Sequence, residues 1–281
     1  ADHGRPHVAV ITTIAPAHIE NLGSLEAIAD EKAQIFTGLS EGGTAIIPAD
    51  LPETQRMIDH ARALGVRFVT FGRNHKADIR LLDAIPNAHG GSLVTADLGD
   101  ARLCYTVAEP GEHWVTNSLA VMAAVRAAGG DLASAGLSMA EMGGLKGRGA
   151  RHAIGVPAGK ATLIDECYNA NPASMRATLR ALGETPAHRR VAVLGAMKEL
   201  GDFSERFHAQ LAEPVMEAII DHAILVGDEM RPLEGELGKW DDNSLGKPPS
   251  FAHCNGPDEA SAALSDYSLT HGDAGLVKGS N

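Results

Sequence analysis

The chain has 281 residues, 44% of them hydrophobic and 21% charged, and its formal net charge is −12. These values are ordinary for a globular protein and exclude a mainly disordered chain. The excess of acid speaks against a nucleic-acid partner, because phosphate binding needs a clustered basic surface. Membrane insertion is not expected either, since the sequence has no run of about 18 apolar residues.

The length exceeds what one core usually holds, so we expect two domains. Cys104, Cys167 and Cys254 are widely spaced and form no CxxC pair. Free thiols in a reducing compartment are therefore expected, and the first residues lack the pattern of a secretory signal, which together predict a cytoplasmic protein. The chain begins without methionine and stops inside a motif described below, so we expect a segment of a longer protein.

In the first half, Val- and Ile-rich runs alternate with helical patterns roughly 30 residues apart, as in βαβ units. This rhythm predicts strands at Val8–Ile14, Thr44–Ile47 and Val66–Phe71 and helices at Leu25–Thr37 and Glu53–Leu64. Alternating segments at Ser92–Leu98 and Ala101–Val107 predict a small antiparallel patch. Asn117 is expected to open a helix that ends near Ala128.

A glycine-rich basic stretch, Gly143–Gly149, is the expected linker, which divides the chain into domains at 1–149 and 150–281. The βαβ rhythm then restarts, with strands predicted at Ala161–Asp165, Arg190–Leu194, Ala223–Val226 and Gly275–Val277. Residues Trp240–Pro249 are expected to form an exposed loop. The predicted fold class is α/β, with a mainly parallel sheet in each domain.

Ligands of open α/β sheets bind beyond the carboxyl ends of the strands. That rule selects the segments Thr13–His18, Asp165–Asn171, Gly195–Glu199 and Lys278–Ser280, which are also rich in polar residues. The helix after the first of them carries Lys32 on a predicted apolar stripe that includes Leu25, Ile28 and Ile35. A lysine there must reach the helix edge, find a carboxylate, lose its proton or be modified.

The run VAVITTIAPAHIENLGSLEAIADEKAQIFTGL resembles a stretch of the Mur ligase family of ATP-dependent peptide ligases, in which a strand, a PAH motif and a GS-initiated helix adjoin the phosphates. The resemblance implies ATP and Mg²⁺ as cofactors, a carbamylated Lys32, and His18 and Lys32 as metal-binding residues. A carbamate supplies the oxygen donors that Mg²⁺ prefers, whereas an ammonium repels the ion. An ordinary helix-edge lysine and a solvated loop histidine are the structural alternatives.

Two further blocks resemble the same family. GEHWVTNSLAVMAAV is similar to a helix start that implies contact of Asn117 with adenine, with Trp114 where the family usually has Asn. KGRGARH is similar to a GR motif and implies that Arg148 contacts nucleotide phosphate at the domain junction. The alternatives are a helix N-cap for Asn117 and a flexible basic linker around Arg148.

The most specific blocks are TLIDECYNANPASMRATL and VAVLGAMKELGDFSERFH, which resemble the D-alanyl-D-alanine-adding branch of the family. The resemblance implies that Asp165 binds the ribose hydroxyls, a role suited to a carboxylate with two acceptor oxygens. Tyr168, Asn169 and Asn171 would line the cleft beside the nucleotide, although an Asx turn explains the asparagines equally well. His208 is open to interpretation as an ordinary helix-surface histidine.

The last block, LVKGSN, resembles a strand ending at which Lys278 and Ser280 contact phosphate or the acceptor carboxylate. Several positions depart from the family: Thr13, Gln34, Cys167 and Ala196 replace Asn, Glu, Ser and an acid, and the last change puts an acid role at Ala196 in doubt. The pattern G-x-x-x-x-G-K-[ST] is absent, and the nearest match, GVPAGKAT, is one residue short. We therefore expect an incomplete P-loop-type central domain, with the phosphate loop upstream, followed by a Rossmann-like C-terminal domain.

The resemblance implies ligation of D-alanyl-D-alanine to UDP-N-acetylmuramoyl-tripeptide through an acyl phosphate, in peptidoglycan precursor synthesis, with Arg148 and Lys278 assisting phosphoryl transfer. A monomer is expected, and the segment alone is expected to be inactive. The alternatives are a related ligase that adds diaminopimelate or lysine, a folylpolyglutamate synthase, and a non-catalytic nucleotide-binding or scaffold protein of the same fold.

Overall fold

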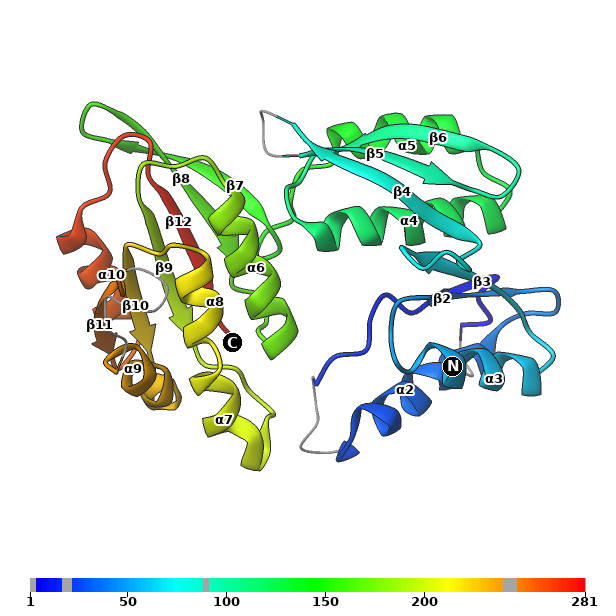
Figure 1. The fold of residues 1–281 in the computed structure, drawn as a ribbon, viewed down its shortest axis with the longest axis horizontal. Helices are drawn as coiled ribbons and strands as arrows, with labels where there is room; N and C mark the ends of the chain where they lie inside the picture. The colour runs from blue at the N-terminus through cyan, green and yellow to red at the C-terminus, as the bar shows by residue number, and fades with distance from the viewer. Residues whose placement is uncertain (1–3, 17–21, 88–90, 240–246, 281) are drawn as a thin grey trace. The chain divides into compact units, whose positions relative to one another are not determined.

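The computed structural model describes residues 4–16, 22–87, 91–239 and 247–280. The chain divides into two compact units, Ala1–Met142 and Gly143–Asn281, and each is described by itself (Figure 1). The glycine-rich stretch Gly143–Gly149 therefore belongs to the second unit. Most of the predicted loop Trp240–Pro249 lies outside the described residues. In the ranges given above, no helix is long and apolar enough to cross a bilayer.

The first unit is built on a six-stranded sheet in the order β1-β2-β3-β4-β5-β6. Its strands are β1 (Val8–Val10), β2 (Thr44–Pro48), β3 (Arg67–Gly72), β4 (Ile79–Pro86), β5 (Ser92–Asp97) and β6 (Arg102–Val107). β1 to β4 are parallel neighbours, whereas β4, β5 and β6 pair antiparallel. The predicted antiparallel patch is thus confirmed, as an extension of the parallel sheet. β1 is shorter than predicted because its register with β2 ends at Val10.

Helices cover both faces of this sheet. The helices are α2 (Leu25–Ala33), which continues as the 3-10 helix η1 (Gln34–Gly38), α3 (Thr54–Ala63), α4 (Glu112–Ala127) and α5 (Leu132–Glu141). Successive residues of β2 point to opposite faces: Ala45 and Ile47 pack with α2 and α3, and Ile46 packs with α4. A strand covered on both sides is apolar along its whole length, which explains the run TAIIP.

The second unit has the strand order β11-β10-β9-β12-β8-β7. Its strands are β7 (Ala150–Val156), β8 (Gly159–Glu166), β9 (Arg190–Gly195), β10 (His222–Val226), β11 (Ser250–Cys254) and β12 (Ala274–Lys278). All neighbours are parallel except the β7–β8 hairpin. The last strand, β12, lies between β8 and β9, so the order of the strands reverses there. Ligands of such sheets bind at the carboxyl ends of the strands beside the reversal.

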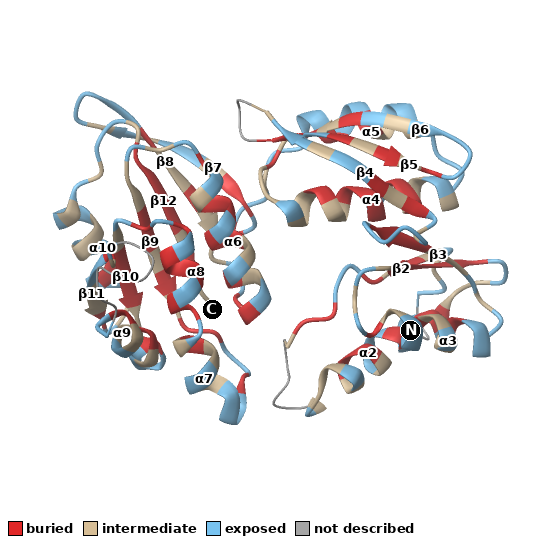
Figure 2. Cartoon of the chain, viewed as in Figure 1, coloured by how far each residue is buried: buried red, intermediate tan, exposed pale blue. Residues whose placement is uncertain are grey.

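The helices of the second unit are α6 (Pro172–Glu184), α7 (Ser204–Ala209), α8 (Ala212–Glu217), α9 (Arg231–Leu237) and α10 (Pro257–Tyr267), with 3-10 helices η2 (Gly201–Phe203) and η3 (Asp228–Met230). On α6, Met175, Leu179 and Leu182 recur at helical spacing and are fully buried. Burial of each such side chain contributes about 1.5 to 3 kcal/mol. Figure 2 shows that β9, β10 and β12 form the buried centre of the unit. The mainly parallel α/β prediction is confirmed for both units.

Candidate functional site

The carboxyl end of β8 is tied to the glycine-rich stretch through Asp165. Its Oδ2 accepts the Gly147 N–H at 2.9 Å, and its Oδ1 accepts the Cys167 N–H at 3.2 Å. The Asp165 carbonyl accepts the Gly149 N–H at 2.9 Å. Burial opposes ionisation, but the hydrogen bonds from Cys167 and Gly147 hold the pKa of Asp165 below its ordinary value. Asp165 is therefore an anion that retains lone pairs for a further donor.

Arg148 stacks on an aromatic ring beside this carboxylate. Its guanidinium carbon lies 4.0 Å from the centroid of the Tyr168 ring, at cation–π distance. The Tyr168 N–H donates to the Gly147 carbonyl at 3.1 Å, and Tyr168 is 57% exposed. The two sequence blocks that carry Arg148 and Asp165 thus meet at one place, and they present a cation and an aromatic face to solvent.

Lys278, the last residue of β12, is buried. Its amine donates to the Asn169 carbonyl at 3.1 Å and lies 3.6 Å from Glu166 Oε2, while the residue is only 2% exposed. Burial lowers the pKa of the amine, and Glu166 opposes that shift. The amine therefore holds the loop after β8, and this internal role is one that the sequence analysis did not predict.

Ser280 joins the loops that follow β8, β9 and β12. Its Oγ lies 2.8 Å from Asn169 Oδ1, to which it donates, and 3.1 Å from the Ala170 N–H, from which it accepts. The same oxygen lies 3.3 Å from the Lys198 N–H, and the Ser280 N–H donates to the Ala196 carbonyl at 3.0 Å. We call this set of loop contacts, centred on Lys278 and Ser280, the strand-end network.

A pocket of about 410 Å³ opens next to the strand-end network. Its walls come from the ends of β9 and β12 and from α10, and they include Val193, Val277, Ala260 and Leu264. Its lining is mostly apolar. Such a hollow, with a few polar groups at its edge, fits a small aliphatic group of a ligand.

Two asparagines of the predicted site occupy helix positions. Asn171 is the N-cap of α6: its Oδ1 accepts the Ser174 N–H at 2.9 Å, and the Asn171 N–H donates to Ser174 Oγ at 3.0 Å. This reciprocal pair is a capping box. The prediction that Asn117 opens a helix is wrong, because α4 begins at Glu112 after Gly111, whose φ of 113° suits glycine. Asn117 instead lies half-buried in the second turn of α4.

In the first unit, Lys32 reaches the segment that follows β1. Its amine donates to the Thr13 carbonyl at 3.1 Å. The residue as a whole is exposed, so its predicted place on the apolar stripe is wrong. Ile28, Ala29 and Phe36 of that stripe are buried as predicted, and Ala33 joins them. Ile35 is 41% exposed because the helix tightens to a 3-10 helix after Ala33 and turns its side chain outward.

Partial burial lowers the pKa of the Lys32 amine, while Glu31 opposes the shift. His18 lies outside the described residues. Within the described ranges, no three His, Cys, Asp or Glu side chains gather as metal ligands. Of the two residues predicted to bind Mg²⁺, the structure therefore describes only Lys32. Its amine lies at the segment that leads to His18.

Sequence reasoning missed Asp50, and it selected the segment that contains Lys198 without predicting a partner for that residue. Asp50, just after β2, accepts the N–H groups of Arg73 and Asn74, both at 2.7 Å, and so fixes the loop after β3. Lys198, after β9, pairs with Glu229 at 3.1 Å. Asp50 lies in the loop after an apolar strand, and that signal was available in the sequence.

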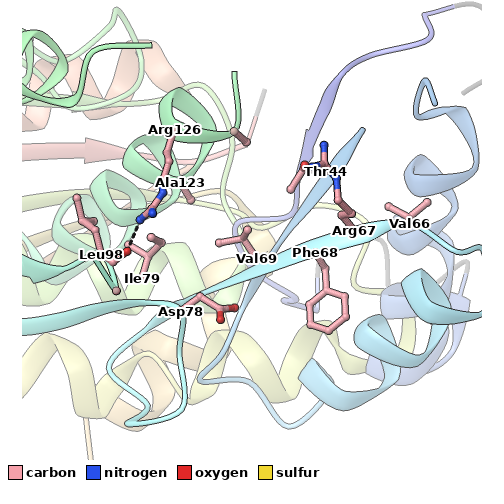
Figure 3. Close-up of a pocket in the computed structure, with 12 residues that line it drawn as sticks. Thr44, Val66, Arg67, Phe68, Val69, Asp78, Ile79, Leu98, Ala123 and Arg126 are labelled. Carbon is pink, nitrogen blue, oxygen red and sulfur yellow. Dashed lines mark hydrogen bonds between the residues drawn. The ribbon is translucent and has the colours of Figure 1, made fainter. Parts of the chain in front are cut away.

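The first unit has a pocket of about 720 Å³, which is larger than the pocket beside the strand-end network (Figure 3). It opens where β3 and β4 diverge, because their register holds only at Phe71↔Ile79 and Gly72↔Arg80. Arg126, at its wall, donates to the Leu98 carbonyl. The hollow reaches Thr44, at the amino end of β2, whereas the predicted ligand residues follow the carboxyl ends. Its size therefore does not make it the candidate site.

Two mainly parallel α/β units with polar loops at their carboxyl edges place the chain in the α/β class, in which ligands bind at such edges. Residues 2–125 match the Mur ligase middle domain, and residues 152–281 match the glutamate ligase domain of Mur ligases. The chain belongs to the Mur ligase family.

Similar proteins include the UDP-N-acetylmuramoyl-tripeptide–D-alanyl-D-alanine ligase of Escherichia coli K12, 32% identical over 236 residues, which cover 83% of this chain and 50% of that ligase. The ligase of the same name from Mycobacterium tuberculosis H37Rv is 27% identical over 296 residues, covering 100% of this chain and 57% of its own length. A crystal structure of MurF from Acinetobacter baumannii superposes with a TM-score of 0.81 at 26% identity, covering 98% of this chain and 57% of that one. The chain thus spans about half the length of the curated relatives it matches.

Proposed function

We propose that the chain forms the middle and C-terminal domains of a ligase that adds D-alanyl-D-alanine to UDP-N-acetylmuramoyl-tripeptide with ATP. The observation that carries the proposal is the strand-end network, in which the blocks DECYNANP, VLGAMKELG and LVKGSN meet around Ser280. Relatives of that name at 27–32% identity support it. We propose further that the protein is a cytoplasmic monomer.

In the proposed reaction ATP transfers its γ-phosphoryl group to the terminal carboxylate of the tripeptide. The amine of D-alanyl-D-alanine then attacks the acyl phosphate, an amide bond forms, and inorganic phosphate leaves. Phosphoryl transfer depends on positioned charge more than on covalent chemistry. Arg148 is proposed to hold a nucleotide phosphate, because Tyr168 fixes its guanidinium plane from one side.

The nucleoside is proposed to contact the same edge. Asp165 accepts the ribose hydroxyls with lone pairs that its two N–H contacts leave available. Tyr168 and Asn169, both exposed, are proposed to lie beside the nucleotide, and Asn117 of the first unit is proposed to contact adenine. Asn171 is proposed to act indirectly on nucleotide binding, because it caps the first turn of α6. Lys278 is proposed to act by holding the Asn169 loop in place for phosphoryl transfer.

Magnesium is proposed to bind at His18 and at Lys32 after Lys32 takes up CO₂, a step that forms an N–C bond and releases one proton. A bound Mg²⁺ would neutralise phosphate charge. The lowered pKa of the Lys32 amine supports this modification, since only the neutral amine attacks CO₂. Its hydrogen bond to Thr13 O keeps the amine at the segment leading to His18.

The test is Lys32→Ala in a polypeptide that joins this chain to a G-x-x-x-x-G-K-[ST] segment, assayed by phosphate release with both substrates. We expect activity to fall at least about a hundredfold, by analogy with loss of an electrostatic stabiliser, and short carboxylates to restore part of it. Lys160→Ala, at the β7–β8 turn, is the control and is expected to be neutral. Undiminished activity of Lys32→Ala would remove the proposed role. The isolated chain, whose 281 residues contain no such segment, is expected to be inactive.

A further inference from the structure

A buried histidine lies behind the strand-end network. His208 of α7 is 0% exposed, so the interpretation of His208 as an ordinary helix-surface histidine is wrong. The Met197 N–H donates to His208 Nε2 at 2.9 Å, and His208 Nδ1 lies 2.8 Å from the Ser204 carbonyl oxygen. Only one neutral tautomer satisfies both contacts: Nδ1 carries the proton and donates it to Ser204, while Nε2 accepts.

The loop held by this imidazole is residues 196–200, between β9 and η2. Ala196 O accepts the Ser280 N–H, and the Lys198 N–H lies against Ser280 Oγ. Glu199 has a φ of 59°, a left-handed conformation that costs a non-glycine residue free energy and needs tertiary support. Met197, between the two network contacts, is the residue that His208 anchors.

We propose that His208 is a positioning residue of the candidate site: its neutral imidazole fixes the 196–200 loop and thereby the places of Lys198 and Ser280. The proposal concerns this loop by itself. Only its consequence for ligand binding rests on the proposed function.

The charged groups that act on the imidazole are Glu229, from η3, and Lys198, from the loop itself. Their effects oppose each other, because Glu229 favours the protonated ring and Lys198 disfavours it. Burial is the largest influence and lowers the pKa of His208, so the ring is neutral at pH 7. A second proton, on Nε2, would face the Met197 N–H and break the anchor.

Two substitutions separate the hydrogen bond at His208 Nε2 from the one at His208 Nδ1. His208→Gln places an acceptor oxygen near the Nε2 position and can keep the Met197 bond, whereas His208→Asn retains only a group near Nδ1. The control is His222→Gln, because His222 also has a pKa lowered by burial but lies at the amino end of β10, bonded to Ser250.

Amide hydrogen exchange of the whole 281-residue chain is the measurement. His208→Asn should speed exchange of the Met197 and Lys198 amides by about tenfold, the equivalent of one lost hydrogen bond. His208→Gln and His222→Gln should leave it within about twofold of the unsubstituted chain. Unchanged exchange in His208→Asn, or equal acceleration by Asn and Gln, overturns the proposal. If neither variant folds, nitrogen-15 shifts of His208 decide: a bare Nε2 supports the anchor, and a protonated Nε2 overturns it.

The catalytic consequence is tested in the ligase that includes the phosphate loop. His208→Asn should raise the KM for D-alanyl-D-alanine at least about fivefold, since loss of a positioning contact of about 1 kcal/mol weakens binding by that factor, and His208→Gln should restore it. A freed loop with unchanged KM would overturn the positioning role. Absence of ligation by the unsubstituted ligase is a failure of the proposed function instead, and it leaves the exchange result intact.

Discussion

Replacement of Lys278 by methionine tests the strand-end network directly. Methionine fills the space of the lysine stem but removes the donor to Asn169 O and the cation beside Glu166. The Lys278 side chain is 1% exposed and that of Glu166 15%, so solvent screens the pair only weakly. Breaking a buried pair by removing one partner costs about 3 to 5 kcal/mol. The 3.6 Å separation is longer than an ideal ion pair, so we expect a value near the lower bound, about 3 kcal/mol.

The assay is urea unfolding followed by circular dichroism, with hydrogen exchange to assign the loss to the second unit. Lys198→Met is the matched control. Lys198 lies at the same strand edge and pairs with Glu229, but their side chains are 52% and 43% exposed. Loss of such an exposed pair costs less than about 1 kcal/mol.

The reasoning is refuted if Lys278→Met destabilises the second unit no more than Lys198→Met does. A double-mutant cycle with Glu166→Gln then locates the error. A coupling near zero would show that the Glu166 carboxylate does not stabilise the buried amine, and that the Asn169 contact alone holds it.

Three further predictions concern local contacts. Asn171→Ala removes the N-cap of α6 and should lower the free energy of unfolding of the second unit by about 1 kcal/mol. Asn171→Asp should retain most of the stability that the cap provides. Equal losses in the two variants would contradict the capping role. Because the pKa of His208 is lowered in the folded state, the unfolded chain binds a proton first as pH falls below about 6.5. Stability should therefore decrease with falling pH from that point, and urea midpoints of His208→Gln should show a shallower decrease; identical slopes would exclude His208 as a source. Asp165→Ala removes the acceptor of the Gly147 and Cys167 N–H groups and should accelerate their hydrogen exchange; unchanged exchange would mean that the carboxylate does not fix the glycine-rich stretch.

Much of the fold follows from local sequence patterns. The strands of both units are short apolar runs bounded by polar or glycine residues, and each predicted strand of the second unit corresponds to an observed one. The errors arise where a tertiary contact competes with a local rule. Asn117 has the residue type of an N-cap, but the helix starts earlier because Gly111 provides the turn and Val115 begins the buried face.

The sequence predicted which loops of the candidate site lie together, but it did not predict most of the contacts between them. The rule for the carboxyl ends of parallel strands selects Asp165, Lys278 and Ser280, and the structure brings their loops together. Periodicity alone could not show that the Lys278 amine faces its own protein, because burial depends on strands far apart in sequence. The same holds for His208, whose partner Met197 belongs to the loop that follows a different element.

The central claim is that these two units belong to a ligase that couples ATP to the joining of D-alanyl-D-alanine and UDP-N-acetylmuramoyl-tripeptide. Its most direct test is inorganic phosphate release by a polypeptide that joins this chain to a G-x-x-x-x-G-K-[ST] segment. We predict release, with equimolar formation of the pentapeptide product, only when ATP and both substrates are present. Phosphate release that ignores D-alanyl-D-alanine, or that responds equally well to a free diamino acid, would contradict the claim.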